Sequence, residues 1–567
     1  MPDRTQGKVV DVLVIGGGLA GLMAAVSARQ AGAQSVLVVD KCEAGKSGAS
    51  VGAKKLAAVG RWSFPTDSAE RHAQDTLRSG CGLNNPRLVN VMATGAEEAI
   101  DAMEHMGMLF DTKDPAAYAA PDRAYVGHGR YRLLQCQDST GKVLLDVLRR
   151  EAYRRRVEIL NNHLVVDLIV NDGEVLGAVA LSVIGGHVVP IGARCTVVAT
   201  GGAGYLYSRT SNPPQLTGSG MWLAYSAGAE LMDLEMVQFY PVNYVYPEAL
   251  AGKNAGSYAE ARLYNAHGER FMQRYAPQDL ENTTRDRLAQ AICLEIRDGN
   301  GTEHGGVFLD RTGLGETYYA QFPVEIQTCL DGGLDLRTEK GEVGPASHYT
   351  MGGIRVDEDL RTSLGRLFAA GEVAAGAHGA NRLADNSLTE TLVLGRRAGQ
   401  QAAQGAKSPH QECRESSVVE QALGPARARL DALCSCAQGD ENPYRAKSVL
   451  RQIMSEGVGV VRSRASLERA LDRLEEQAAR LPDALRLPPF SGGANLLLAE
   501  AVELLQMLGL SDLITRAALF RTESRGAHFR EDHPQRDDEN WTRNVVVRKV
   551  AGRPEISTAL PSGETLP

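Results

Sequence analysis

A glycine-rich turn near the start of the chain limits what the chain can fold into. Residues 16–21 read Gly-Gly-Gly-Leu-Ala-Gly and fit the pattern GxGxxG, between an apolar run at 9–15 and a small-residue stretch at 19–30. A second apolar run, 35–40, ends at Asp40. Runs of this length predict a strand, a helix and a second strand. In such a unit the glycines let the backbone approach a pyrophosphate, and the acid can bind ribose hydroxyls. The pattern predicts a doubly wound, Rossmann-like α/β domain that binds a dinucleotide.

The size and charge of the chain exclude several classes of protein. A chain of 567 residues exceeds what one core serves, so we expect two or three domains. The net charge of −8 argues against a nucleic-acid partner, which favours a basic surface. No uninterrupted apolar run reaches about 18 residues, so no segment is expected to span a membrane. A strand within the first ten residues leaves no room for a signal peptide, which predicts a cytoplasmic location, with membrane association through a partner as the alternative.

The nine cysteines are scattered, and only Cys434 and Cys436 lie close together. A lone CxC lacks the further ligands that a metal site needs, so we expect reduced thiols and no metal.

Beyond the first unit the pattern changes several times. Residues 68–106 are helical in pattern, and 164–191 predict two β-hairpin arms with turns at 171–173 and 185–186. The stretch 240–344 reads as irregular, with two short helices, and is a candidate lid. Long amphipathic helices follow Pro409, and after Arg525 the chain reads as charged and loop-like.

Five further segments carry a family resemblance. They are residues 199–204 (ATGGAG), 236–241 (MVQFYP), 348–354 (HYTMGGI), 370–388 and 523–528 (ESRGAH). In order and spacing they resemble the flavoprotein subunits of fumarate reductase and succinate dehydrogenase, and L-aspartate oxidase. The resemblance implies FAD as the cofactor. It also implies an FAD-binding domain in two parts, 1–239 and 347–408, with an inserted α+β capping domain at 240–346. A C-terminal helical domain at 409–530 and a tail at 531–567 would follow.

The resemblance also implies which residues bind FAD. Glu372 would bind the ribityl chain, while Ser387 and Leu388 would present backbone to the pyrimidine end of the flavin. The full expected set is Gly16, Gly18, Leu19, Ala20, Gly21, Asp40, Lys41, Ser47, Gly48, Ala49, Ala199, Thr200, Gly201, Glu372, Asn386, Ser387 and Leu388. Many relatives carry a histidine bonded covalently to the flavin where this chain has Gly48. We therefore expect FAD to be bound non-covalently. Ser219 stands where the family usually has aspartate, which predicts a weaker contact on the adenosine side.

A substrate carboxylate needs a clamp, for which the planar fork of arginine is well shaped. His348 and Arg382 match the carboxylate-binding pair of the family, and Arg285 matches its proton-shuttle arginine. The alternative for each is a residue that only holds a loop or lies on the surface. Free arginine keeps its proton far above neutral pH, so it suits the role of acid better than that of base.

Two departures from the family point to a changed substrate. Tyr240 stands where the family has a histidine that helps to hold the second carboxylate. The stretch 254–262 lacks the Arg and Glu of the usual proton relay, which Glu260 and Arg262 would have to replace from shifted positions. We expect a second-carboxylate site rebuilt with tyrosines, namely Tyr240, Tyr244, Tyr246 and Tyr258. The alternative is that tyrosine fills space in a working dicarboxylate site.

The predicted activity is that of an FAD-dependent oxidoreductase acting on CH–CH groups of small carboxylic acids. The chain has one GxGxxG pattern, no CxxCH and no cysteine run for an iron–sulfur cluster. Electrons would then pass to or from a separate iron–sulfur or other electron-transfer subunit, a diffusible carrier, or oxygen. The alternatives are an amino-acid oxidase of the L-aspartate oxidase kind and a non-catalytic subunit that relays electrons.

Overall fold

The computed structural model describes residues 9–111, 127–136, 139–256, 258–319, 322–407, 412–435, 439–490 and 493–561. Cys436, the predicted boundary at residue 409 and the last six residues of the predicted tail lie outside these ranges.

A seven-stranded sheet forms the centre of the molecule. Its order is β5-β2-β1-β8-β7-β6, with β15 beside β8, and β1 runs parallel to β2 and β8. The strands are β1 Val9–Ile15, β2 Val36–Val39, β5 Glu158–Leu160, β6 His163–Asn171, β7 Glu174–Ser182, β8 His187–Val198 and β15 Leu367–Ala369. The predicted strand–helix–strand unit and both hairpin arms are confirmed.

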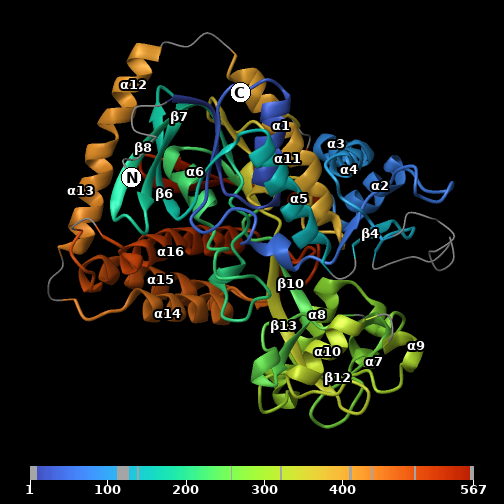
Figure 1. Ribbon diagram of the computed structural model, residues 1–567. Coiled ribbons are helices and arrows are strands. Elements are labelled where there is room, and N and C mark those ends of the chain that lie inside the picture. The colour runs from blue at the N-terminus through green and yellow to red at the C-terminus, as the bar shows by residue number, and fades with distance from the viewer. Residues whose placement is uncertain are drawn as a thin grey trace.

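Helices cover both faces of this sheet (Figure 1). On one face lie α1 Leu19–Gln30, α5 Thr140–Arg154 and α11 Asn386–Gly405, and α1 packs closely against α11. On the other face lies α6 Ser219–Ala227. Successive residues of β1 point to opposite faces, so Val12 and Val14 join the core under α1 while Leu13 joins the one under α6. The doubly wound α/β architecture is confirmed.

The segment predicted to be helical, 68–106, forms three helices. They are α2 Ala69–Ser79, α3 Pro86–Thr94 and α4 Ala96–His105. Ser68 and Asn85 cap the first two by accepting hydrogen bonds from backbone N–H groups. The short antiparallel pair of β3 Lys55–Ala57 and β4 Leu133–Gln135 lies beside α11.

A second body with its own hydrophobic core is connected to the rest of the molecule by two long strands (Figure 1). Its antiparallel sheet has the order β10-β13-β12-β11. The elements are β10 Val237–Tyr246, β11 Arg262–Tyr264, α7 Met272–Tyr275, α8 Arg285–Glu295, β12 Val307–Asp310, α9 Glu316–Tyr319, α10 Pro323–Asp331 and β13 Gly341–Thr350. The prediction of an irregular stretch is wrong here, because β10 is completed by β13 roughly a hundred residues later in the chain, beyond the reach of a local pattern.

The predicted C-terminal helices are confirmed. They are α12 Glu412–Gln421, α13 Leu423–Cys434, α14 Pro443–Gly457, α15 Arg464–Ala484 and α16 Leu496–Phe520. Helices α14, α15 and α16 pack together below the central sheet in Figure 1. In the described part of the chain, every helix is too short or too polar to cross a membrane.

The chain after Arg525 is not the loop that its charge predicts. It forms β18 Phe529–Arg530, which pairs with β17 Val461–Arg462, then α17 Asp538–Trp541, β19 Asn544–Val550 and β20 Arg553–Ala559. The last two complete a five-stranded sheet with β9 Leu231–Met232, β14 Gly353–Arg355 and β16 Ala374–Ala375. The prediction was wrong because three consecutive buried valines, Val545 to Val547, let this charged segment form a hairpin that pairs with β9.

Candidate functional site

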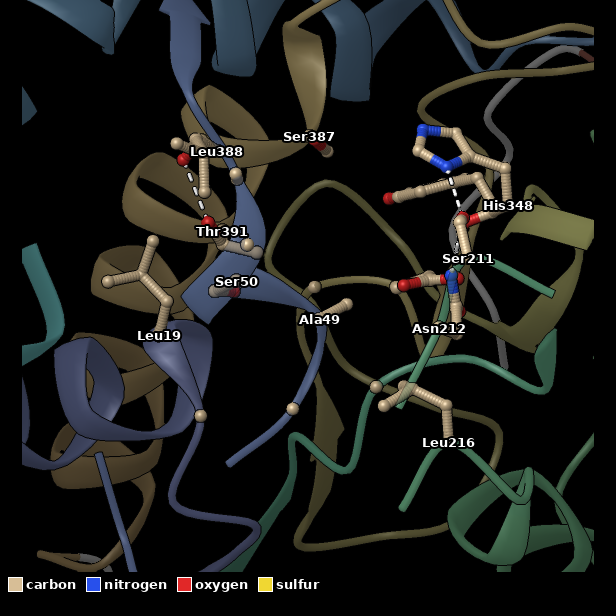
Figure 2. Close-up of a pocket in the computed structure, with 18 of the residues that line it drawn as sticks. Leu19, Ala49, Ser50, Ser211, Asn212, Leu216, His348, Ser387, Leu388 and Thr391 are labelled. Carbon is tan, nitrogen blue, oxygen red and sulfur yellow. Dashed lines mark hydrogen bonds between the residues drawn. The ribbon is translucent and has the colours of Figure 1, made fainter. Parts of the chain in front are cut away.

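A cavity of about 940 Å³ runs from the glycine-rich turn to the second body. It is lined by β1 and α1 at one end, by the start of α11 in the middle, and by β10, α8 and β13 at the other end. Figure 2 shows Leu19, Ser387 and Leu388 on one side, and Ser211 with His348 on the other. The cavity therefore joins the two bodies at one continuous site.

The glycine-rich turn needs its glycines for close backbone packing. A Cβ added at Gly21 would lie 1.9 Å from the carbonyl oxygen of Gly16, whereas one added at Gly18 would meet nothing within 4 Å. Gly21 thus holds the turn against the start of α1, and Gly18 leaves backbone open to the cavity. The two oxygens of Asp40 accept hydrogen bonds from Gly17 N at 2.6 Å and Cys42 N at 2.7 Å. Asp40 shapes this turn as well as lining the cavity.

Lys41 lines the same end of the cavity, but its ammonium is already paired. It forms an ion pair with Glu503 of α16 and donates to Thr217 Oγ1 at 3.1 Å. Glu503 also pairs with the buried Lys447 of α14 at 3.1 Å. These contacts tie the C-terminal helices to the end of the cavity where the glycine-rich turn lies.

The middle of the cavity combines open backbone with one buried acid. Gly48 has φ of +89°, and a Cβ there would meet nothing within 4 Å. Glu372 Oε1 accepts a hydrogen bond from Thr350 N at 3.0 Å. Burial raises the pKa of Glu372 to about 8, so its carboxyl is protonated at neutral pH and can both donate to and accept from hydroxyl groups. Ser387 and Leu388 line the cavity in the first turn of α11, where N–H groups have no partner within the helix.

Arg382 lies at the far end of the cavity and is 4% exposed. Its guanidinium donates to Gln238 Oε1 at 3.0 Å and to the Leu383 carbonyl at 3.3 Å, which leaves Nε without a partner. The ring of Tyr349 lies 4.7 Å from its Cζ. Burial, and then the charge of Arg285, lower the pKa of Arg382 to about 10, so it stays cationic at neutral pH. A fixed guanidinium with a spare N–H is suited to holding an anion.

His348 stands beside this cation with a neutral ring. Burial, and then the charges of Arg382 and Arg285, hold the pKa of His348 well below its ordinary value. Its Nδ1 lies 2.7 Å from Ser211 Oγ, a contact drawn in Figure 2. The serine fixes the ring orientation, so that the imidazole can hydrogen-bond a substrate without adding charge.

Arg285 lines the cavity, so the alternative interpretation of this residue as a surface arginine is wrong. It begins α8 and lines the cavity, and its buried Nε and Nη1 have no hydrogen-bond partner. Its Cζ lies 5.2 Å from the ring centre of Tyr240, whose ring centre is in turn 5.3 Å from that of His348. The structure thus brings Arg285, Tyr240, His348 and Arg382 to one end of one cavity.

The tyrosine wall differs in part from the prediction. Tyr240 and Tyr258 line the cavity in an edge-on pair, and Tyr244 lines it too, although Arg311 donates to its hydroxyl. Tyr246 is 45% exposed and stacks on His304 outside the cavity. Its inclusion was wrong, because the bulged register of β10 turns it to solvent. Tyr240 donates its hydroxyl to the Ala255 carbonyl at 2.8 Å, so it presents its ring to the cavity.

Three other predicted residues do not line the cavity. Gly21 packs under the turn, and the side chain of Asn386 is held by His72 and by Thr76. Arg262 is exposed on β11, whereas Glu260 does reach the cavity wall.

Several lining or supporting residues escaped the sequence analysis. Ser211 orients His348, Gln238 holds Arg382, and Asp385 lines the cavity between Arg382 and α11. Gln238 and Asp385 lie inside matched segments, so their position was visible but their contacts were not. Ser211 lies in a segment that gave no signal.

The residues present fit a bound dinucleotide with a flavin. The cavity is long, its turn end has open backbone at Gly18, and its middle has the protonated Glu372 opposite the N–H groups of α11. Gly18 and α11 would hold the phosphates and the ring end, while Gly48 leaves open space beside them.

A first prediction concerns how FAD is held. We expect FAD to leave the protein on acid precipitation and to appear in the supernatant, because Gly48 has no side chain to bond it. The absorbance of the supernatant near 450 nm measures the released fraction. Flavin that stays with the pellet and resists detergent would contradict this prediction.

Comparisons with known proteins agree with this fit. A family model described as "FAD binding domain" matches residues 11–388, and one described as "Fumarate reductase flavoprotein C-term" matches residues 447–562. A fumarate reductase (CoM/CoB) subunit of Methanothermobacter marburgensis is 38% identical over 95% of this chain and 97% of its own. L-aspartate oxidase of Streptomyces coelicolor is 35% identical over 95% and 91%. The structure of E. coli quinol fumarate reductase FrdA superposes with a TM-score of 0.89 at 30% identity, covering 99% of this chain and 98% of FrdA.

These matches span both the FAD-binding part and the C-terminal helices, and they include reductases as well as an oxidase. The chain belongs to the FAD-dependent family of fumarate reductase and succinate dehydrogenase flavoprotein subunits, which also contains L-aspartate oxidase.

Proposed function

We propose that this protein moves a hydride between flavin and the outer carbon of the C–C bond next to a substrate carboxylate, in enoate reduction or the reverse dehydrogenation. FAD, when bound, supplies the two-electron hydride chemistry. The observation that carries the proposal is a pair of guanidinium groups, Arg285 and Arg382, with unpartnered N–H groups at the same end of the cavity. An unfilled donor pair of this kind is expected to bind an anion.

In this proposal Arg382 and the neutral His348 hold the substrate carboxylate. Arg382 cannot turn away, because Gln238 and the Leu383 carbonyl already fix two of its nitrogens. A positive charge held against the carboxylate also stabilises the negative charge that develops next to it during reduction. The clamp therefore orients the double bond and activates it.

Arg285 is assigned the proton transfer. It begins α8 and lines the cavity, so its guanidinium can give a proton to the carbon beside the one that receives the hydride. Arginine is a weak acid, which suits donation to a strongly basic carbanion-like centre. Glu260 also reaches the cavity and is assigned the return of the proton from solvent.

The substrate is proposed to be an unsaturated monocarboxylate rather than fumarate. Where the family has a cationic group for a second carboxylate, Tyr240 presents an aromatic ring. Its hydroxyl already donates a hydrogen bond to the Ala255 carbonyl. Burial, and the neighbouring Tyr258, raise the pKa of Tyr240, so the phenol stays neutral. A ring packs against apolar or planar groups and leaves a second carboxylate without a partner.

The domain assignment supports a closing motion. If residues 240–346 form a capping domain, Arg285 belongs to the cap and Arg382 to the FAD-binding domain. Closure would then exclude water and bring both cations to the substrate in one step.

The electron partner is proposed to be a separate protein. The relative from M. marburgensis is named as one subunit of a reductase, and this chain lacks a second nucleotide pattern and the cysteine runs of iron–sulfur clusters. A docked iron–sulfur or other electron-transfer protein would deliver electrons to the flavin or remove them.

The test is a steady-state assay with a reduced viologen dye as electron donor and a panel of acids. We expect turnover with acrylate, cinnamate or urocanate and slow or no turnover with fumarate. Tyr240→His should raise kcat/KM for fumarate by about tenfold, roughly the value of one charge-assisted hydrogen bond. Fumarate as the best substrate of the unaltered protein would contradict the monocarboxylate proposal. Hydrogen peroxide formed from an amino acid would instead favour the L-aspartate oxidase alternative.

A further inference from the structure

Asp385 is an acidic residue built firmly into the wall of the substrate end. It precedes α11 with φ of 60°, in the left-handed region that few residues other than Gly, Asn and Asp adopt. Its carbonyl accepts a hydrogen bond from Ala57 N at 3.0 Å. Its two neighbours are also fixed, because His128 Nε2 lies 2.8 Å from the Ala384 carbonyl and His72 Nε2 lies 2.8 Å from Asn386 Oδ1. The backbone therefore holds the side chain of Asp385 at the cavity.

The carboxylate of Asp385 is not used by the helix that it precedes. It makes no capping hydrogen bond to α11, and its buried Oδ2 has no hydrogen-bond partner. Acidic residues at this position normally accept from the first N–H groups of the helix. A buried carboxylate oxygen without a hydrogen-bond partner lowers the stability of the folded protein, which indicates a functional role for this residue.

Two cations share the cavity end with Asp385. The Nε of Arg382 and the Nε and Nη1 of Arg285 are likewise buried without partners. Burial and the charge of Arg285 lower the pKa of Arg382, and the negative charge of Asp385 opposes part of that fall; the same charge contributes to the raised pKa of Arg285. All three side chains line the same cavity, where the carboxylate offsets part of the positive charge of the two arginines.

The other groups at this end add little net charge, because the buried Glu325 on the cavity wall is paired with Arg311 at 2.7 Å. His348 is neutral because of its burial between two arginines, Tyr240 is a buried phenol, and Glu372 is protonated at neutral pH. The lysines and Glu260 on the cavity wall are partly or fully exposed, where solvent screens them. Two arginines and one aspartate leave a net charge that a single carboxylate neutralises.

We propose that Asp385 is a specificity-determining residue that restricts the site to acids with one negative charge. The inference rests on the proposed function and deepens it. Tyr240 offers no hydrogen-bond partner to a second substrate carboxylate, whereas Asp385 repels that carboxylate. A dianion brought within several ångströms of this half-buried carboxylate loses affinity by about tenfold.

The test compares fumarate with monomethyl fumarate, which has the same four-carbon chain, a methyl ester at one end and one charge fewer. Asp385→Asn should raise kcat/KM for fumarate by about tenfold and leave that for monomethyl fumarate within about twofold. Asparagine tolerates the left-handed backbone, so the variant should fold. Glu248→Gln, which removes one exposed charge from the second body outside the cavity, serves as the control and should leave the ratio unchanged.

A binding measurement separates this inference from the proposed function. Succinate and monomethyl succinate are titrated into the oxidised protein, and the change in flavin absorbance gives a Kd for each. Asp385→Asn should tighten succinate about tenfold relative to monomethyl succinate, even if no acid is turned over, which would contradict the proposed reaction alone. An unchanged ratio in both experiments, or an equal fall in kcat for both acids, would overturn the role assigned to Asp385. Failure of both acids to bind, in the unaltered protein and in the variant, would overturn both proposals.

Discussion

Replacing Arg285 with glutamine should lower kcat by about a thousandfold, within the range of 10²–10⁴ that a positioned acid contributes. The reason is that Arg285 combines two unpartnered nitrogens with a place at the cavity end beside Tyr240 and His348. Glutamine keeps a polar amide on a shorter, uncharged side chain and has no ionised N–H group to donate a proton. FAD content should stay unchanged, because Arg285 lies at the opposite end of the cavity from the glycine-rich turn. Single-turnover oxidation of the reduced flavin by substrate measures the effect.

The matched control is Arg287→Gln, two residues further along α8. Arg287 is exposed, so its loss removes the same charge from the same helix without touching the cavity. Its kcat should stay within about twofold of the unaltered protein, as for most surface substitutions. Equal losses for the two variants would show that Arg285 acts through helix stability or net charge. An active Arg285→Gln variant would favour a flavin-carrying protein that only relays electrons.

Gly21→Ala should abolish FAD binding at micromolar concentration. The added Cβ would lie 1.9 Å from the Gly16 carbonyl oxygen, a backbone atom that cannot swing aside as a side chain does. The turn and the start of α1 must then separate, at a cost of about 3 kcal/mol or more, which is at least a hundredfold in affinity. Equilibrium dialysis of the apoprotein against FAD gives the Kd. Full FAD occupancy in the variant would show that the turn has another way to adjust.

A glycine elsewhere provides the control for this substitution. Gly424 lies exposed in α13, and a Cβ there would meet nothing within 4 Å. Gly424→Ala should bind FAD normally and be slightly more stable, because alanine favours a helix over glycine by roughly 1 kcal/mol. A fall in FAD binding in both variants would point to general damage.

The parts of the fold that the sequence predicts are those with a local pattern. The strand–helix–strand unit at 9–39 and the hairpins at 163–198 carry their turn residues and periodicity within a few residues. Strand β10 and the hairpin of β19 and β20 are different, because each is completed by a partner far away in the chain. Taken alone, their residues show no strand pattern; they form strands because they pair with β13 and β9.

The candidate site divides in the same way. Arg382, His348 and Glu372 stand in segments that resemble a family, so their place in one cavity could be predicted. The contacts that those residues make could not be predicted. Ser211 reaches His348 from 137 positions earlier, and Gln238 reaches Arg382 from 144 positions earlier. Tyr246 was expected in the wall because its neighbours Tyr240 and Tyr244 are there, but a bulge in β10 changes which side chains face inward.

The measurement that tests the central claim most directly is an anaerobic single turnover. The protein is photoreduced, mixed with an unsaturated monocarboxylate, and followed by flavin absorbance, after which the product is quantified by NMR. The account predicts reoxidation of the flavin together with one saturated acid formed per flavin, for an unsaturated monocarboxylate and much more slowly for fumarate. Flavin that every acid leaves reduced, and that only oxygen reoxidises, would contradict it.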